Sequence, residues 1–165
     1  MARDALLPLA RRVGARLKAR RLKLATAESC TGGWIAQAVT SVAGSSDWFE
    51  RGFVTYSNEA KKELLGVASR TLSRHGAVSE ETAREMASGA LRRSAAHVAI
   101  AVTGIAGPGG GTREKPVGMV CFAWSFGSRA PQSTVRRFPG NRDGIRRRSV
   151  AFALRGLLER LAEKE

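Results

Sequence analysis

Three side chains that could act as nucleophiles stand in a row before two glycines: Ser29, Cys30, Thr31, Gly32 and Gly33. Residues 22–25 have the apolar, extended character of a strand, and residues 34–39 have the apolar spacing of a buried helix. The row is therefore expected at a helix N-terminus, where unpaired N–H groups and the helix dipole favour an oxyanion or a phosphate. The pattern fits an ordinary Ser/Thr helix cap, with glycines for close packing, equally well.

A hydroxyl nucleophile needs a base, and histidine, the usual base, is scarce in this chain. His75 is expected in a polar turn. His97 is expected at the start of a strand, which is the wrong end of the sheet for such a site. A Ser-His-Asp triad is therefore not expected. Lysine can replace histidine if its pKa is lowered, and Lys61 is the candidate.

Ser57 and Asn58 supply the capping chemistry for the next helix. If Asn58 is the cap, Lys61 lies in the first turn, where the positive end of the helix dipole disfavours a cation. Lowering a lysine pKa from about 10.4 to near 7 requires roughly 4 to 5 kcal/mol, which the dipole alone does not supply. Burial of the amine must provide most of this free energy. The alternative is that Lys61 and Lys62 lie together on a solvated helix face; of the two, Lys62 is the one we expect in solvent.

Two further segments offer polar groups to the same space. Tyr56, the only tyrosine of the chain, is expected at a strand end, where its phenol could donate to an oxyanion or could be a plain strand-end aromatic. Thr103 and Gly104 follow an apolar strand and offer a hydroxyl and an N–H, and the glycines after them, Gly107 included, allow close approach to a ligand. This loop lacks the Lys-Ser/Thr ending of a P-loop and the spacing of a dinucleotide-binding motif, so both of those functions are disfavoured.

Arg142 and Arg146 are expected at the start of the last helix, one turn apart. Together they could clamp a phosphate monoester with help from the helix dipole. Most arginines in so basic a chain must lie in solvent, so the alternative is that Arg142 and Arg146 are ordinary surface residues.

Helical and strand patterns alternate along the chain. Helices are predicted around the apolar positions of residues 6–17, 34–39, 58–65, 79–91 and 145–161. Strands are predicted at residues 22–25, 49–56, 97–103, 117–124 and 133–138. The run at 97–103 is apolar enough to be central, and the strand at 133–138 is expected nearer an edge.

The alternation predicts an α/β fold, a three-layer α/β/α sandwich with a mixed, mostly parallel central sheet. Because ligands collect beyond the carboxyl ends of the strands in such a sheet, the segments that carry Ser29, Tyr56, Thr103 and Arg142 are expected to meet in one pocket.

Length and composition fit one domain spanning residues 1–165, with 43% apolar residues and no linker. The N-terminus contains Asp4 and Pro8 and is expected to be neither a signal nor an anchor, and no apolar run approaches the ~18 residues that span a membrane.

Two cysteines, Cys30 and Cys121, are too few for a disulfide framework, so a cytoplasmic protein is expected. No His or Cys pair has ligand spacing, and neither a metal nor a cofactor is expected.

The net charge of +14 requires nucleic acid to be considered as a partner. However, 22 of the 28 basic residues are Arg, dispersed over several expected elements, and aromatic residues do not interleave with them, so nucleic-acid binding is not expected. A homodimer is expected, with Trp48 and Phe49 as exposed contact residues, although core packing is the commoner use of such side chains.

Five long motifs, in this order, resemble the CinA C-terminal domain family: Thr26–Gly33, Gly44–Lys61, His75–Ser79, Thr103–Pro108 and Lys115–Gly118. The resemblance covers nearly the whole chain, and several motifs in one order are far more specific than a single glycine loop. It implies hydrolytic deamidation of nicotinamide mononucleotide to nicotinate mononucleotide and ammonia, in pyridine nucleotide (NAD) salvage. It also implies a stand-alone enzyme, because longer members carry an additional N-terminal domain.

The resemblance also implies roles for single residues. Ser29 matches the nucleophile, Lys61 its base, Tyr56 and Thr103 the supporting hydroxyls, and Arg142 a substrate-binding position. The other expected substrate-binding residues lie in the turns and loops around them: Cys30, Thr31, Gly32, Gly33, Asn58, Gly104, Gly107 and Arg146.

Two alternatives stay open. Cys30 is a rival nucleophile because it adjoins Ser29 and is intrinsically more reactive, although no histidine is positioned to pair with it. The chain could also be a catalytically weak regulatory protein that binds phosphate or nucleic acid, given its strong positive charge.

Overall fold

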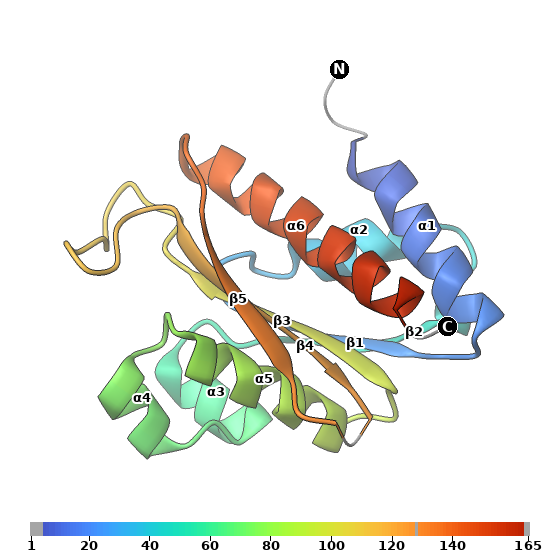
Figure 1. Ribbon diagram of the computed structural model, residues 1–165, viewed down its shortest axis with the longest axis horizontal. Coiled ribbons are helices and arrows are strands. Elements are labelled where there is room, and N and C mark those ends of the chain that lie inside the picture. Colours follow the sequence, from blue (N-terminus) through green and yellow to red (C-terminus); the bar gives the residue numbers. More distant parts are fainter. Residues whose placement is uncertain (1–4, 128, 164–165) are drawn as a thin grey trace.

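A five-stranded sheet forms the middle layer of the molecule (Figure 1). The computed structural model describes residues 5–127 and 129–163, and the order across the sheet is β2-β1-β3-β4-β5. The strands are β1 (Leu24–Glu28), β2 (Phe49–Val54), β3 (Val98–Gly104), β4 (Met119–Phe126) and β5 (Gln132–Arg137). The predicted strands are present with small shifts at their ends, β3 is central, and β5 lies at an edge as expected.

Four of the five strands run in the same direction. β1 is parallel to both of its neighbours, β2 and β3, whereas β4 is antiparallel to β3 and β5 is antiparallel to β4. β4 therefore opposes the other described strands, and the sheet is mixed but mostly parallel. The carboxyl ends of β1, β2, β3 and β5 consequently lie at the same end of the sheet.

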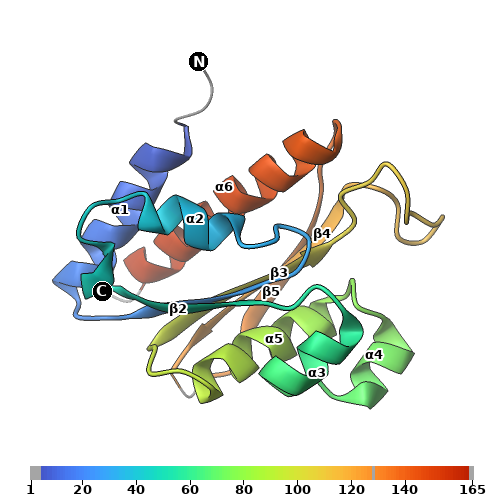
Figure 2. The ribbon, with the colours of Figure 1, turned by 180° about the vertical axis from the view of Figure 1, so that it is seen from behind.

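Helices cover both faces of the sheet (Figures 1 and 2). One face carries α1 (Leu6–Ala19), α2 (Trp34–Thr40) and α6 (Arg142–Ala162), and the other carries α3 (Asn58–Leu65), α4 (Ser69–His75) and α5 (Glu80–Arg92). A short 3-10 turn, η2 (Ser45–Asp47), precedes β2. The fold is thus the predicted three-layer α/β/α sandwich. No helix in the described part of the chain combines the length and apolar character needed to cross a membrane.

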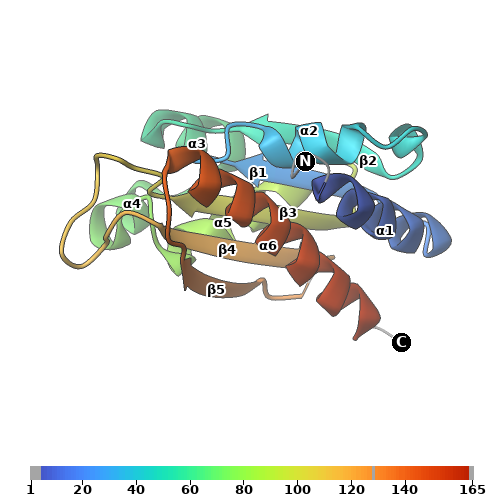
Figure 3. The same cartoon turned by 90° about the horizontal axis from the view of Figure 1, so that it is seen from above.

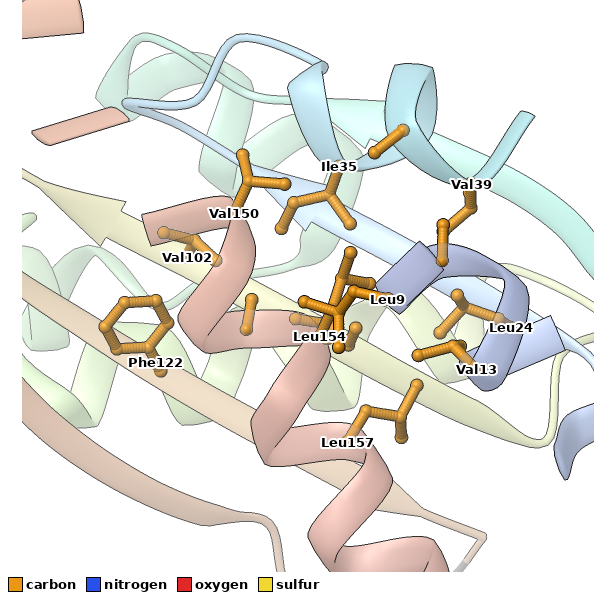
Figure 4. Packing of buried hydrophobic residues seen from close by; sticks show 14 of the residues in the cluster. Leu9, Val13, Leu24, Ile35, Val39, Val102, Phe122, Val150, Leu154 and Leu157 are labelled. Carbon is orange, nitrogen blue, oxygen red and sulfur yellow. The ribbon is translucent and has the colours of Figure 1, made fainter. Parts of the chain in front are cut away.

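The two faces of the sheet are packed with side chains of different size. Because side chains alternate along a strand, each face builds its own hydrophobic cluster. On the α1/α2/α6 face the side chains are large; those labelled in Figure 4 are Leu9, Val13, Leu24, Ile35, Val39, Val102, Phe122, Val150, Leu154 and Leu157. Seen from above, α6 crosses β3 and β4 on this face (Figure 3). The opposite face is lined by alanines of β1 and β3, which let α5 lie close to the sheet.

Two local predictions differ from the structure. Residues 69–75 form α4, for which no helix was predicted, so His75 ends a helix instead of lying in a polar turn. Trp48, expected at the surface, is only 3% exposed and packs against α1. A Cβ atom at Gly14 would lie 2.5 Å from the Trp48 ring, so the glycine makes room for it. Phe49 is half-buried against the same cluster, so Trp48 is not the exposed contact residue that was expected.

Candidate active site

Four segments that lie far apart in the sequence meet beyond the carboxyl ends of the strands, as predicted. Ser29 directly follows β1, Tyr56 follows β2, and Thr103 lies at the end of β3. Arg142 begins α6 after β5 and reaches the same place. These segments and α3 enclose a cavity of about 220 Å³, lined by Ser29, Cys30, Tyr56, Lys61, Ala77, Val78, Thr103, Gly104, Ala106 and Arg142.

Lys61 and Ser29 are in contact inside this cavity. The Lys61 Nζ lies 2.9 Å from the Ser29 Oγ, 2.8 Å from the carbonyl oxygen of Thr55 and 3.3 Å from that of Tyr56. Lys61 is 1% exposed and Ser29 is 7% exposed. The structure therefore brings the expected nucleophile and base within hydrogen-bonding distance.

The surroundings of Lys61 suit an uncharged amine. A neutral amine has two N–H donors and one lone pair, so the two carbonyl groups can take both N–H bonds and leave the lone pair for the Ser29 hydroxyl. Burial lowers the pKa of Lys61 below its ordinary value. Among the described residues, no carboxylate forms an ion pair with Lys61 to counter this effect. Burial thus favours the neutral amine, the form that can accept a proton.

Helix α3 buries one of its two lysines. Lys61 and Leu65 are its buried residues and lie one turn apart on the same face. Lys62, the next residue, turns outward and forms an ion pair of 2.9 Å with Glu59. The prediction that Lys62 is the solvated lysine is confirmed.

The cap of α3 is the first of the two residues expected to supply it. Ser57 is the N-cap residue, and its side chain accepts the N–H of Ala60. Asn58 is the first residue of the helix, is exposed and does not line the cavity. Of the two, Ser57 is therefore the cap and Asn58 is not, and the Lys61 N–H makes the first bond of the helix, to the Ser57 carbonyl.

Cys30 lies beside Ser29 but in a setting that disfavours its thiolate. Burial raises the pKa of Cys30 to about 12, and the nearby Glu28 carboxylate adds to this effect. No histidine lines the cavity: His75 ends α4, and His97 lies at the far end of the sheet, where its Nδ1 accepts the Lys23 N–H. The thiol therefore stays protonated, and no histidine lies beside it to act as its base.

Arg142 joins Tyr56 to the glycine loop at the mouth of the cavity. Its guanidinium donates through Nη1 to the carbonyl oxygen of Gly107 (2.6 Å) and through Nη2 to the Tyr56 hydroxyl (3.2 Å). Tyr56 is 63% exposed, and Arg142 is exposed as well. An anion in front of the cavity would meet the remaining N–H donors of this guanidinium.

Thr103 supports the wall of the cavity. Its Oγ1 donates to the carbonyl oxygen of Ala77 at 2.8 Å, which uses the single proton of the hydroxyl. The bond ties the segment that contains Ala77 and Val78 to the end of β3. Gly104 follows, and a Cβ there would lie 2.8 Å from the side chain of Val120, so a larger residue does not fit.

Four of the expected substrate-binding residues lie outside this cavity and line a second hollow: Thr31, Gly32, Gly33 and Arg146. Arg146 donates to the carbonyl oxygens of Cys30 and Thr31 at 3.1 Å each, and its guanidinium lies 5.2 Å from the centre of the Trp34 ring. Arg146 thus binds the turn itself. Arg142 and Arg146 line different hollows, so the structure does not bring them together as the predicted clamp requires.

Glu28 is a residue that the sequence analysis does not single out, although it adjoins Ser29. It is 1% exposed, and its carboxylate accepts three hydrogen bonds. The donors are the Thr31 hydroxyl (2.6 Å) and the N–H groups of Ile35 (2.8 Å) and Ala36 (3.0 Å). The Ile35 and Ala36 N–H groups at the start of α2 are therefore occupied by this carboxylate and are not available to an external anion. A signal in the sequence is an acid at the end of an apolar strand, just before a threonine and a helix.

The cavity combines a buried amine, a serine hydroxyl and an exposed guanidinium. Within the described residues, no group of three or more His, Cys, Asp and Glu side chains could hold a metal ion. The groups present can transfer a proton from the Ser29 hydroxyl to Lys61 and present the serine oxygen to an electrophilic carbon.

Comparison with known proteins gives the family of the chain. The model of the CinA C-terminal domain matches residues 6–161. The chain belongs to this family. A family relative from Escherichia coli (strain K12), named nicotinamide-nucleotide amidohydrolase PncC, is 52% identical over 160 residues, which are 96% of each chain. A relative of the same name from Pseudomonas putida is 49% identical over 156 residues, 94% of this chain and 97% of the other.

Solved structures of the family have the same architecture. The competence/damage inducible protein CihA from Agrobacterium tumefaciens has a TM-score of 0.91 and 49% identity, covering 93% of this chain and 94% of its own. The fold class and the family resemblance expected from the sequence are thereby confirmed.

Proposed function

We propose that this protein hydrolyses the carboxamide of nicotinamide mononucleotide, giving nicotinate mononucleotide and ammonia. The observation that carries the proposal is the buried contact of 2.9 Å between the Lys61 Nζ and the Ser29 Oγ at the end of a cavity. The substrate class comes from the names of the relatives in Escherichia coli and Pseudomonas putida. The reaction belongs to pyridine nucleotide salvage and needs no cofactor.

The proposed mechanism is nucleophilic amide hydrolysis. Neutral Lys61 takes the proton of the Ser29 hydroxyl while the serine oxygen attacks the carboxamide carbon. Protonated Lys61 then gives this proton to the amide nitrogen, the C–N bond breaks, and ammonia leaves an acyl-enzyme on Ser29. Water attacks the acyl group with Lys61 again as the base. The carboxylate product departs, and the proton returns to Ser29.

A backbone N–H of the turn after Ser29 is the proposed oxyanion donor. Cys30, the turn residue directly after Ser29, lines the cavity, whereas Thr31 is completely buried and lines the second hollow. In the described part of the chain the Cys30 N–H donates to no oxygen, so it is the candidate donor. One such donor is typically worth roughly 3 to 4 kcal/mol of transition-state stabilisation. Thr103, whose proton is used by Ala77, contributes to the wall of the site instead.

Arg142 and Tyr56 are the proposed contacts of the nucleotide outside the reacting centre. Arg142 carries a positive charge at the mouth of the cavity and would bind the substrate phosphate. Tyr56, bonded to Arg142, would keep the guanidinium at this position. Gly107, whose carbonyl accepts the other Arg142 bond, would support the same arrangement.

Ammonia release from nicotinamide mononucleotide by the purified protein tests the proposal. Ser29→Ala should abolish the release while the protein stays folded, whereas Cys30→Ser should retain turnover. Addition of a chelator should leave the rate unchanged. Full activity of Ser29→Ala would eliminate the serine mechanism. DNA binding with a steep salt dependence and no ammonia release would favour the regulatory alternative.

A homodimer and a cytoplasmic location stay predictions. Of the two residues expected at the subunit contact, Trp48 is buried and Phe49 is half-buried. Sedimentation of the purified protein measures the oligomeric state directly.

A further inference from the structure

We infer that Glu28 is a positioning residue, whose carboxylate holds the turn that carries Ser29 at the correct distance from Lys61. The inference rests on the proposed function, because it concerns the Ser29 and Lys61 pair of that reaction. Glu28 ends β1 directly before Ser29 and is almost completely buried. Among the described residues its carboxylate does not line the cavity and forms no hydrogen bond or ion pair with Lys61, so its hydrogen bonds reach the site through the turn.

The turn from residue 29 to residue 33 has few bonds of its own. Within the described chain, its internal backbone hydrogen bonds run from Gly32 N–H to the Ser29 carbonyl and from Trp34 N–H to the Thr31 carbonyl. Gly33, the N-cap of α2, has a φ of +101° and makes no side-chain capping bond. A polar side chain from elsewhere must therefore satisfy the first N–H groups of the helix.

Glu28 performs this capping from the other side of the turn. Its Oε1 accepts the Thr31 hydroxyl and the Ile35 N–H, and its Oε2 accepts the Ala36 N–H. One carboxylate thus ties the last residue of the strand to the middle of the turn and to the start of the helix. The Ser29 N–H is fixed independently by the carbonyl of Val102 on β3.

Loosening these bonds should affect turnover more than substrate binding. Ser29 lies between the two anchored ends of the turn, and a shift of about 1 Å in a reacting group can cost about 100-fold in rate. Arg142 and Tyr56 belong to other segments and do not contact Glu28. The expected signature is a lower kcat with a nearly unchanged KM.

Glu28→Gln is the test variant, because it keeps the size of the side chain. An amide has one acceptor oxygen, so it cannot accept at both carboxylate positions, and its NH₂ group faces an N–H donor at the other. The arrangement of the turn is therefore disturbed without leaving a cavity. The expected result is a kcat lower by about 10- to 100-fold, with KM within about twofold of wild type.

Glu85 provides a matched control in the same chain. Its carboxylate accepts the Ala68 N–H (2.9 Å) and the Thr71 hydroxyl (2.5 Å) at the start of α4, and it does not line the cavity. Glu85→Gln removes the same kind of capping contact away from the site. Both variants should lower the Tm, but only Glu28→Gln should lower kcat. A kcat for Glu28→Gln that matches that of Glu85→Gln would overturn the inference.

Thr31 supplies a second pair of variants in case Glu28→Gln does not fold. Thr31→Ser keeps the hydroxyl that donates to Glu28 and should retain kcat, whereas Thr31→Val lacks it and should share the kcat loss. Equal kcat values for these two variants would contradict the positioning role.

A readout without substrate separates this inference from the proposed function. If the wild-type protein releases no ammonia, or if Ser29→Ala keeps the activity, the proposed function has failed. Amide hydrogen exchange of residues 29–36 then still tests the role of Glu28. Faster exchange in Glu28→Gln than in Glu85→Gln supports it, and equal exchange overturns it.

Discussion

The Lys61 Nζ lies 2.9 Å from the Ser29 Oγ, although 32 residues separate the two in the chain. Ser29 follows β1 and Lys61 lies in the helix after β2, and these strands are parallel neighbours. The Thr55 N–H donates to the Glu28 carbonyl at 2.8 Å and extends this pairing beyond the strand ends. The pair is therefore a product of the strand order, and the variants below test what it does.

Replacing the buried amine should remove activity without unfolding the protein. Lys61→Met keeps an unbranched side chain of similar length but no proton acceptor, so ammonia release should fall by at least ~100-fold, as for loss of a general base. The free energy of unfolding should not decrease, because a buried amine carries a desolvation cost. Lys62→Met is the control and should behave like wild type in both assays. Substantial turnover by Lys61→Met would assign the base to another group.

The pH dependence follows from the lowered pKa of Lys61. Only the neutral amine accepts the Ser29 proton, so kcat/KM should rise with pH and level off below the ordinary lysine value of about 10.4. An activity plateau reached only above that value would contradict the role of burial.

The lowered pKa of Lys61 also predicts that the stability of the protein changes with pH. Between the lowered pKa and the ordinary one, the unfolded state binds a proton at Lys61 that the folded state does not bind. The free energy of unfolding should therefore rise with pH through this window. Denaturant unfolding at several pH values measures the rise, and Lys61→Met should lack it.

Arg142 should contribute to binding of the phosphate more than to chemistry. Arg142→Lys cannot make both guanidinium hydrogen bonds, to the Gly107 carbonyl and to the Tyr56 hydroxyl. The KM for nicotinamide mononucleotide should therefore rise by about 10- to 100-fold, with a modest change in kcat. With nicotinamide riboside, which lacks the phosphate, the same variant should match wild type. Arg155→Lys, an exposed position on the same helix, is the control. An equal loss on both substrates would place the phosphate elsewhere.

Thr103 should act through the wall of the cavity. Thr103→Val leaves the Ala77 carbonyl without its partner, so stability should fall by about 1 to 3 kcal/mol and KM should rise. Thr103→Ser restores the donor and should recover both values. A selective loss of kcat in Thr103→Val would instead indicate that the hydroxyl donates to the oxyanion.

Much of the architecture and of the site could be predicted because it depends on local patterns. Hydrophobic periodicity determines which face of an element is buried, and strand order with parallel connections brings loop ends together. These patterns were sufficient to single out Ser29 and Lys61 as candidate site residues. Helix α4 was not, because it has no buried residue and hence no apolar stripe to recognise.

The partners of the polar groups depended on tertiary structure. The sequence by itself determined the layers, the family and the chemical types of the site residues. Only the folded chain decided that Glu28 occupies the start of α2, that Arg146 binds the turn, and that Thr103 donates to Ala77. The physical reason is that a hydrogen bond depends on atoms brought within about 3 Å, and here the two partners lie on different elements or turns whose relative placement only the folded chain determines.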